Sequence, residues 1–257
     1  VLLREPPLLI SITVLFLLFG LFIIYPFIKI LMVPDAEHWM RALTAKEFLE
    51  VFSHTLFSSL VATTTAIIFG FIFAYAVNYT NMPGKRFFQV VALLPTMAPS
   101  VVTGLAFIML FGRRGFITWH VLHLQTDLYG PVGLWVAQTI AFFPLAYITI
   151  SGVLKSISPN LELAAQNLGA RGWYLFRTVT LRLATPGLAS AFLLVGINSL
   201  ADFGNPMLVG GNYHVLATEA YTQVTGAWDL PMGAVLSVFL VIPTLLVFFV
   251  QRYYLEK

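Results

Sequence analysis

Apolar residues dominate six long stretches of the chain, and shorter polar segments separate them. The stretches cover roughly residues 8–33, 53–78, 87–112, 132–155, 186–208 and 231–251. Each is near the roughly 17–25 residues that a helix needs to cross a bilayer. None alternates between apolar and polar positions as a barrel strand does, and a helix satisfies its backbone groups within one segment. The pattern predicts an all-α integral membrane protein with about six transmembrane helices.

Composition supports this prediction. Hydrophobic residues make up 59% of the 257 residues and charged residues only 10%, whereas roughly 25% of an ordinary soluble domain is charged. The chain contains no Cys, which excludes disulfides and thiolate metal sites. A net charge of +3 is too small to indicate nucleic-acid binding. The first apolar stretch is longer than that of a signal peptide, so we expect it to remain as a membrane helix.

Basic residues gather on one side of the predicted membrane. If the N-terminus is cytoplasmic, that side holds nine of the 14 Lys and Arg residues. These nine are Arg4, Lys85, Arg86, Lys155, Arg171, Arg177, Arg182, Arg252 and Lys257. Because cytoplasmic loops are enriched in Lys and Arg, we expect both ends of the chain to be cytoplasmic.

Proline interrupts several of the predicted spans. The residues are Pro95, Pro99, Pro144, Pro206 and Pro243. Each removes a backbone hydrogen bond, which neighbouring helices or a water-filled cavity must replace. Proline is common in membrane helices, so no single one indicates a function. Together they suit helices that line a path and change shape.

The polar segment 156–185, which we call the insert, lies between the fourth and fifth spans. Ser158 followed by Pro159 predicts the start of a helix. That helix is expected to end at Gly169, where glycine permits a turn, and a second helix is expected over Trp173–Leu183. Two interpretations are open from the residues alone: an amphipathic helix on the membrane surface, or a docking site for a partner protein.

The run LELAAQNLGA within the insert resembles the EAA loop of ABC-importer permeases, the transmembrane subunits of type I importers. Positions on the family pattern are Ala164, Ala165, Gly169, Ala170, Phe176, Thr180 and Leu181. Two positions depart from it. Leu163 stands where the family usually has Glu, with Glu162 one place earlier, and Arg182 stands where it usually has Pro. The lost Glu puts the strength of the ATPase contact in doubt.

The resemblance implies that the insert is the coupling helix that enters a cleft of a cytoplasmic ATPase. The coupling residues expected from it are Glu162, Ala164, Ala165, Gly169, Ala170, Arg171 and Phe176. It also implies the type I importer permease fold and a location in the bacterial cytoplasmic (inner) membrane. The expected partners are a cytoplasmic ABC ATPase dimer, a periplasmic or extracellular solute-binding protein, a second permease half and membrane lipid. ATP and Mg would be bound by the ATPase subunits, and this chain would bind no cofactor.

Two further segments, LLPTMAPSVVTGLAF and NSLADFGNPMLVGGNYHVLATEAY, extend the resemblance to ferric-iron-type permeases. Chains of that subgroup usually carry two permease halves in tandem. Residue 1 is Val rather than an initiator Met, so we expect one transmembrane permease domain over 1–257 that is the N-terminal half of a longer permease, or alternatively a single unit that dimerises. The solute expected from the resemblance is ferric iron. Sugar phosphate, phosphonate and polyamine are alternatives.

Asp202 is the acidic residue that falls inside a predicted span, close to Asn198 and Asn205. A carboxylate within the membrane commonly marks a functional site. We therefore predict that these three residues line or gate the translocation path; the alternative is that Asp202 lies in water at the outer mouth of the fifth span. A secondary carrier would use Asp202 to couple to a cation, but the chain shows no inverted repeat.

No motif for chemistry is present. The chain has no P-loop, HExxH or GxSxG motif, so hydrolysis of ATP is assigned to a partner and no catalytic residue is predicted. His120 and His123 are three residues apart, but two histidines do not complete a metal site. No metal site is predicted.

Overall fold

The computed structural model describes residues 6–123, 128–250 and 252–253. Helices are the only regular elements among these residues. In chain order they are α1 (Pro6–Phe19), η2 (Gly20–Ile24), α2 (Tyr25–Met32), α3 (Ala36–Thr44), α4 (Lys46–Tyr79), α5 (Lys85–Met97), α6 (Ser100–Phe111), η3 (Phe116–Val121), α7 (Pro131–Ser156), α8 (Pro159–Asn167), α9 (Gly172–Leu175), η4 (Phe176–Thr180), α10 (Leu181–Leu200), α11 (Gly204–Val209), α12 (Leu216–Thr225) and α13 (Leu230–Val250).

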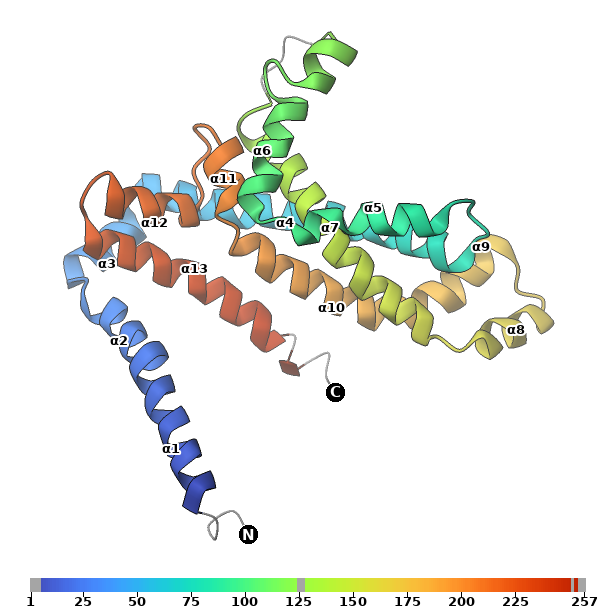
Figure 1. The fold of residues 1–257 in the computed structure, drawn as a ribbon, viewed down its shortest axis with the longest axis horizontal. Coiled ribbons are helices and arrows are strands. Elements are labelled where there is room, and N and C mark those ends of the chain that lie inside the picture. The colour runs from blue at the N-terminus through green and yellow to red at the C-terminus, as the bar shows by residue number, and fades with distance from the viewer. Residues whose placement is uncertain (1–5, 124–127, 251, 254–257) are drawn as a thin grey trace.

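Six helical segments of the described chain are long and apolar enough to cross a membrane, which confirms the predicted all-α membrane fold. They are Leu8–Met32, Lys46–Tyr79, Ser100–Val121, Pro131–Ser156, Gly172–Leu200 and Leu230–Val250. The first of them lies against α13 through α2, while α1 extends away from the other spans (Figure 1). None of its most apolar window is buried.

The third span differs from the predicted continuous helix over 87–112. Helix α5 ends at Met97, and α6 begins at Ser100. Pro99 has no N–H to continue the helix, and it forces the preceding Ala98 into an extended conformation (φ −98°, ψ 137°). The membrane-length segment of this region therefore begins at Ser100 and extends to Val121, with a turn at 112–115 between α6 and η3.

The fifth span is also displaced from its predicted range of 186–208. Its helix begins in the insert at Gly172, continues through η4 and α10, and ends at Leu200. Pro186 lies inside α10 and does not end it, so the predicted second insert helix, Trp173–Leu183, and the apolar stretch form one helix. Residues 204–209 form the separate short helix α11, with Pro206 in its first turn, where a missing N–H is tolerated.

A stripe of small residues on α4 sets the spacing of the core. Ser58, Ala62, Ala66, Gly70 and Ala74 recur every fourth position and are buried. Small residues on one helical face let neighbouring helices approach closely. Helices α7 and α10 pack closely against this face of α4, and their side chains complete the core. These side chains are Ala146, Tyr147, Ile150, Leu154, Ala184, Ala191 and Val195.

A second apolar cluster lies at one end of the bundle. It joins α3, α4, α12 and α13 and contains Ala42, Phe48, Val51, Leu216, Ala220, Met232, Val235 and Leu236. Helices α8 and α9 of the insert lie at the opposite end (Figure 1). The long helix α4 reaches from one end to the other.

Gly70 is the tightest point of the contact between α4 and α7. A Cβ atom added there would lie 2.7 Å from the Cβ of Ala146 and 3.0 Å from the backbone nitrogen of Tyr147. We expect Gly70→Val to destabilise the protein by about 1–3 kcal/mol, because the helices must separate to accept the side chain. Thermal unfolding in detergent measures this. Gly152→Ala is the control, since a Cβ there meets nothing within 4 Å; equal midpoints for the two variants would contradict the packing.

Candidate functional site

Asp202 lies between the end of α10 and the start of α11, and its carboxylate is held inside the protein. The residue is 6% exposed. Its Oδ2 accepts hydrogen bonds from Asn205 Nδ2 at 2.8 Å and from Gln138 Nε2 at 3.1 Å. Its Oδ1 accepts a longer bond, 3.4 Å, from the backbone N–H of Asn205. Gln138 is 2% exposed and Asn205 is 0% exposed, so the carboxylate is surrounded by buried amide donors.

Ser199 completes what we call the Asp202 cluster: Gln138, Ser199, Asp202 and Asn205. The Ser199 hydroxyl donates to Gln138 Oε1 at 3.5 Å, and Gln138 Nε2 lies 3.4 Å from the Ser199 carbonyl oxygen. The cluster therefore joins α7 to the end of α10 and the start of α11. A buried polar group must be hydrogen-bonded to be tolerated, and these four side chains satisfy one another.

The cluster lies where the two interrupted spans meet. Gly204, the first residue of α11, lies against Ser100, the first residue of α6; a Cβ at 204 would be 2.4 Å from Ser100 Oγ. Thr103 of α6 donates to Asn205 Oδ1 at 3.5 Å. The helix breaks at 97–100 and 200–204 therefore face each other, and the glycine is needed for this close approach.

The structure brings together two of the three predicted path residues. Asp202 and Asn205 share the cluster, but Asn198 lies apart, is exposed and donates only to the Leu194 carbonyl of its own helix, at 2.8 Å. Asp202 is not a water-exposed carboxylate at a loop. Sequence reasoning missed Gln138 and Ser199. An amide within the apolar run VGLWVAQTIAFF was the available signal for Gln138.

The residues of the insert divide into an inward and an outward set. Gly169 has φ +92°, so the predicted glycine turn between the two helices is present. Ala170 is buried, and Glu162, Ala165 and Phe176 are partly buried. Ala164, Gly169 and Arg171 are exposed, together with the apolar side chains of Leu161, Leu163, Leu168, Trp173 and Tyr174.

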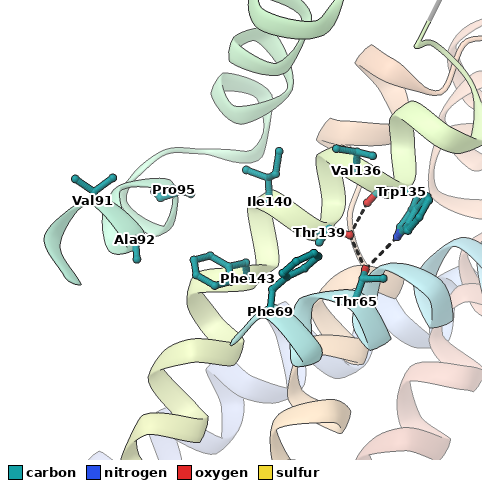
Figure 2. Close-up of a pocket in the computed structure, with 10 residues that line it drawn as sticks. All are labelled: Thr65, Phe69, Val91, Ala92, Pro95, Trp135, Val136, Thr139, Ile140 and Phe143. Carbon is teal, nitrogen blue, oxygen red and sulfur yellow. Dashed lines mark hydrogen bonds between the residues drawn. The ribbon is translucent and has the colours of Figure 1, made fainter. Parts of the chain in front are cut away.

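A pocket of ≈ 650 Å³ lies between α4, α5 and α7. Figure 2 shows its one polar network: Trp135 Nε1 donates to Thr65 Oγ1 at 3.0 Å, and the Thr65 and Thr139 hydroxyls are 2.7 Å apart. The other lining side chains are apolar, among them Phe69, Pro95 and Phe143. Ions lose too much hydration energy in such surroundings to bind there, so we do not assign this pocket to an ionic solute.

The end of the bundle opposite the insert carries histidines and carboxylates that sequence reasoning did not combine. His54 of α4 stacks on Tyr213 with ring centroids 3.9 Å apart, and His214 Nδ1 lies 2.9 Å from Glu219 Oε2. Burial raises the pKa of the Tyr213 phenol, which stays protonated and donates to the His54 carbonyl at 3.2 Å. These contacts fix the loop after α11 against α4.

No group of three His, Cys, Asp or Glu side chains in the described residues could hold a metal ion. His120 lies in η3 and is exposed, and His123 follows it in a turn with φ 50°. A turn lies at 211–212, with Gly211 at φ +57°.

The fold and the insert match a known family. Residues 66–257, which include the whole insert and the Asp202 cluster, match the binding-protein-dependent transport system inner membrane component family. The chain belongs to this family. It is therefore a transport subunit and a multi-pass protein of the inner membrane, as the resemblance predicted.

Two relatives of this permease are named as ferric transport system permeases. FbpB 1 of Haemophilus influenzae is 32% identical and aligns over 94% of this chain and 40% of its own length. FbpB of Actinobacillus pleuropneumoniae is 34% identical over 91% of this chain and 36% of its own. The chain thus spans less than half the length of these relatives.

Solved structures share the fold of this permease. A chain of a bacterial alginate ABC transporter, solved in complex with an alginate pentasaccharide-bound periplasmic protein, superposes with a TM-score of 0.81 at 17% identity. The match covers 100% of this chain and 97% of that one. A chain of the MetNI methionine ABC transporter gives 0.59 at 20% identity, over 83% of this chain and 98% of that chain. These matches confirm the type I importer permease fold.

The Asp202 cluster predicts a large cost for losing its carboxylate. Asp202→Ala leaves the buried amides of Gln138 and Asn205 without their acceptor, and each unsatisfied group costs about 1–3 kcal/mol. We expect a lower midpoint of thermal unfolding in detergent. Asn198→Ala is the control on the same segment; because Asn198 is exposed, its change is expected to stay within about 0.5 kcal/mol. Equal midpoints would show that the cluster does not stabilise the fold.

Proposed function

We propose that this permease forms one half of the translocation path of an ATP-driven importer. An external binding protein delivers the solute, and a cytoplasmic ABC ATPase dimer binds ATP and Mg and drives transport. The observation that carries this proposal is the family match over residues 66–257, which includes the insert. Without a P-loop of its own, the permease depends on a partner for ATP hydrolysis.

The insert supplies the surface for the ATPase. Leu161, Leu163 and Ala164 on α8 are exposed and apolar, as is Leu168 directly after it, while the Glu162 side chain faces the bundle. Exposed apolar side chains gathered on one short helix favour a protein contact. The small side chain of Ala164 lets a partner approach the helix closely. Placing this surface in the cytoplasm agrees with the nine basic residues on that side.

A second permease half would complete the path. Helix α1 with η2 and α2 forms a membrane-length helix of which none of the most apolar window is buried, and its α1 part extends away from the other spans in Figure 1. A helix exposed in this way offers a large surface to a neighbouring subunit or to lipid. The greater length of the FbpB relatives supports a second half in the same chain.

We propose ferric iron as the solute, delivered by a ferric-binding protein. The names of both FbpB relatives support it, and they align over more than nine-tenths of this chain. A sulfate permease, CysT of Escherichia coli, is 29% identical over 69% of this chain, so an oxyanion is the competing solute.

The insert surface is tested by enlarging Ala164. We expect Ala164→Trp to weaken ATPase binding about five- to hundred-fold, the equivalent of about 1–3 kcal/mol of overpacking at 1.4 kcal/mol per decade. Retention of the ATPase on the purified transporter and solute-stimulated ATP hydrolysis are measured. Ala227→Trp is the matched control, because Ala227 is exposed at the other end of the bundle. Full retention in Ala164→Trp would indicate that the insert contacts lipid instead, where Trp strengthens binding.

Solute identity is tested by uptake in cells that carry the complete transporter. We expect the intact system to accumulate radioactive Fe³⁺ and its deletion to abolish that uptake, because ferric permeases align over most of the chain. Sulfate and molybdate are supplied in parallel as competing solutes. Uptake of either anion with no uptake of iron would overturn the ferric assignment and leave the importer assignment in place.

A further inference from the structure

Glu162 of the insert faces the membrane bundle. Its Oε1 accepts a hydrogen bond from Thr180 Oγ1 at 2.7 Å. Thr180 is the last residue of η4 and is 2% exposed. This hydrogen bond therefore ties α8 to η4, the turn that precedes α10.

The neutral hydroxyl of Thr180 holds this carboxylate. Among the described residues no ion pair joins Glu162 to Lys, Arg or His, whereas the ion pairs of Asp229, Glu50 and Glu219 lie at the other end of the bundle. Hydrogen bonds to a charged acceptor are stronger and more directional than those between neutral groups. The Glu162 contact therefore fixes the direction of α8.

Aromatic rings reinforce the same joint. Phe176 of η4 packs edge-on against Tyr75 at 5.2 Å and lies 5.9 Å from Phe71, both on α4. Trp173 stacks on Phe176 at 5.0 Å, and Tyr75 stacks on Tyr79 at 4.9 Å. Aromatic pairs at these distances add to the energy of burial alone. Phe176, predicted to couple to the ATPase, thus packs on the permease's own α4.

The other end of α4 holds the loop that follows α11. The backbone N–H of Leu216 donates to Thr55 Oγ1 at 2.8 Å, and His54 Nδ1 lies 3.2 Å from the His214 carbonyl oxygen. With the stacking of His54 on Tyr213 and the Tyr213 hydroxyl bond to the His54 carbonyl, four contacts join α4 to residues 213–216. Helix α4 is continuous from Lys46 to Tyr79 and has no proline, so it links the two ends of the bundle as one rigid element.

We propose that Glu162 is a positioning residue that couples the insert to α4, so that a displacement of α8 is transmitted along α4 to residues 210–216 at the opposite face. This rests on the proposed function in one respect, that a partner ATPase moves the insert. The carboxylate does not contact that partner. It acts through Thr180 of η4, whose Phe176 packs on Tyr75 and Phe71 of α4, and the exposed face of α8 remains available for docking.

Substitutions at Thr180 separate this role from docking, because Thr180 is buried beneath the insert and cannot touch a partner. Thr180→Val removes the hydroxyl and keeps the shape, whereas Thr180→Ser keeps the hydroxyl. Glu162→Ala removes the acceptor, and Glu162→Gln keeps an oxygen that can accept the Thr180 bond. Gln166→Ala, at an exposed position of the same helix, is the control for altering α8.

The readout is the amount of solute transported per ATP hydrolysed by the complete transporter in proteoliposomes. We expect Thr180→Val and Glu162→Ala to lower this ratio about fivefold or more, the low end of typical coupling between sites. The double variant should fall no further, because both changes break the same contact. Thr180→Ser, Glu162→Gln and Gln166→Ala should keep the ratio. Retention of the ATPase should be unchanged in every variant.

A second measurement follows the far end of α4 directly. The chain has no Cys, so a single cysteine in place of the exposed Asn212 can carry an environment-sensitive fluorophore. We expect ATP to change its emission in the wild-type background and to have little effect with Thr180→Val. An unchanged transport ratio together with an unchanged ATP response in Thr180→Val would overturn the proposal. Loss of ATPase binding in the wild type would instead overturn the coupling function on which it rests.

Discussion

The close approach of α4 and α7 at Gly70 determines the geometry of the rest of the bundle. A lipid-facing bundle gains little from hydrophobic burial between its helices, so close packing and interhelical hydrogen bonds carry more of its stability. Small residues at every fourth position of α4 bring α7 near enough for Asn78 Nδ2 to reach Ser151 Oγ at 2.9 Å. The same approach places Thr65 beside Thr139 and Trp135. Polar links between the two helices therefore occur near both ends of their contact.

The interrupted helices depend on this frame. Two spans stop within the bundle, at 97–100 and at 200–204, and each break leaves backbone groups that lipid cannot satisfy. The Asp202 cluster lies where the two breaks meet. It includes Gln138 of α7, and the contact with α4 holds α7 in place. A buried carboxylate is costly unless donors surround it. In this protein the Asp202 carboxylate orders the region in which the regular helical hydrogen bonds stop.

The sequence predicted the number of spans, the helical class and the insert, because apolar length and glycine or proline positions are local signals. It misplaced two boundaries. The fifth span began earlier than expected because a polar segment can continue a helix beyond the apolar stretch, as here, where Phe176 packs on α4 and Trp173 stacks on Phe176. The third span broke at Pro99, where local backbone restriction outweighed the apolar run.

The roles of single residues were harder to predict than the helices. The resemblance grouped Glu162, Ala164 and Phe176 together, but Ala164 is exposed whereas the other two side chains face the bundle. Sequence spacing alone does not show which side of a short helix faces the bundle. Gln138 joined Asp202 across 64 residues, and only the fold brings the two together. Such long-range polar contacts leave no periodic pattern in one sequence.

The π-helical turn η4, between α9 and α10, determines how α8 and α9 are rotated relative to α10. Because successive residues of an α-helix are rotated by about 100°, the one extra residue in a π-turn shifts the angular phase of everything that follows. In this permease that shift lies at Phe176–Thr180, between the α9 start of the helix and its membrane-embedded part. The number of residues in this turn therefore sets the direction in which α8 and α9 point. A sequence that gained or lost one residue here would rotate them about the axis of α10 and leave the packing within the bilayer intact.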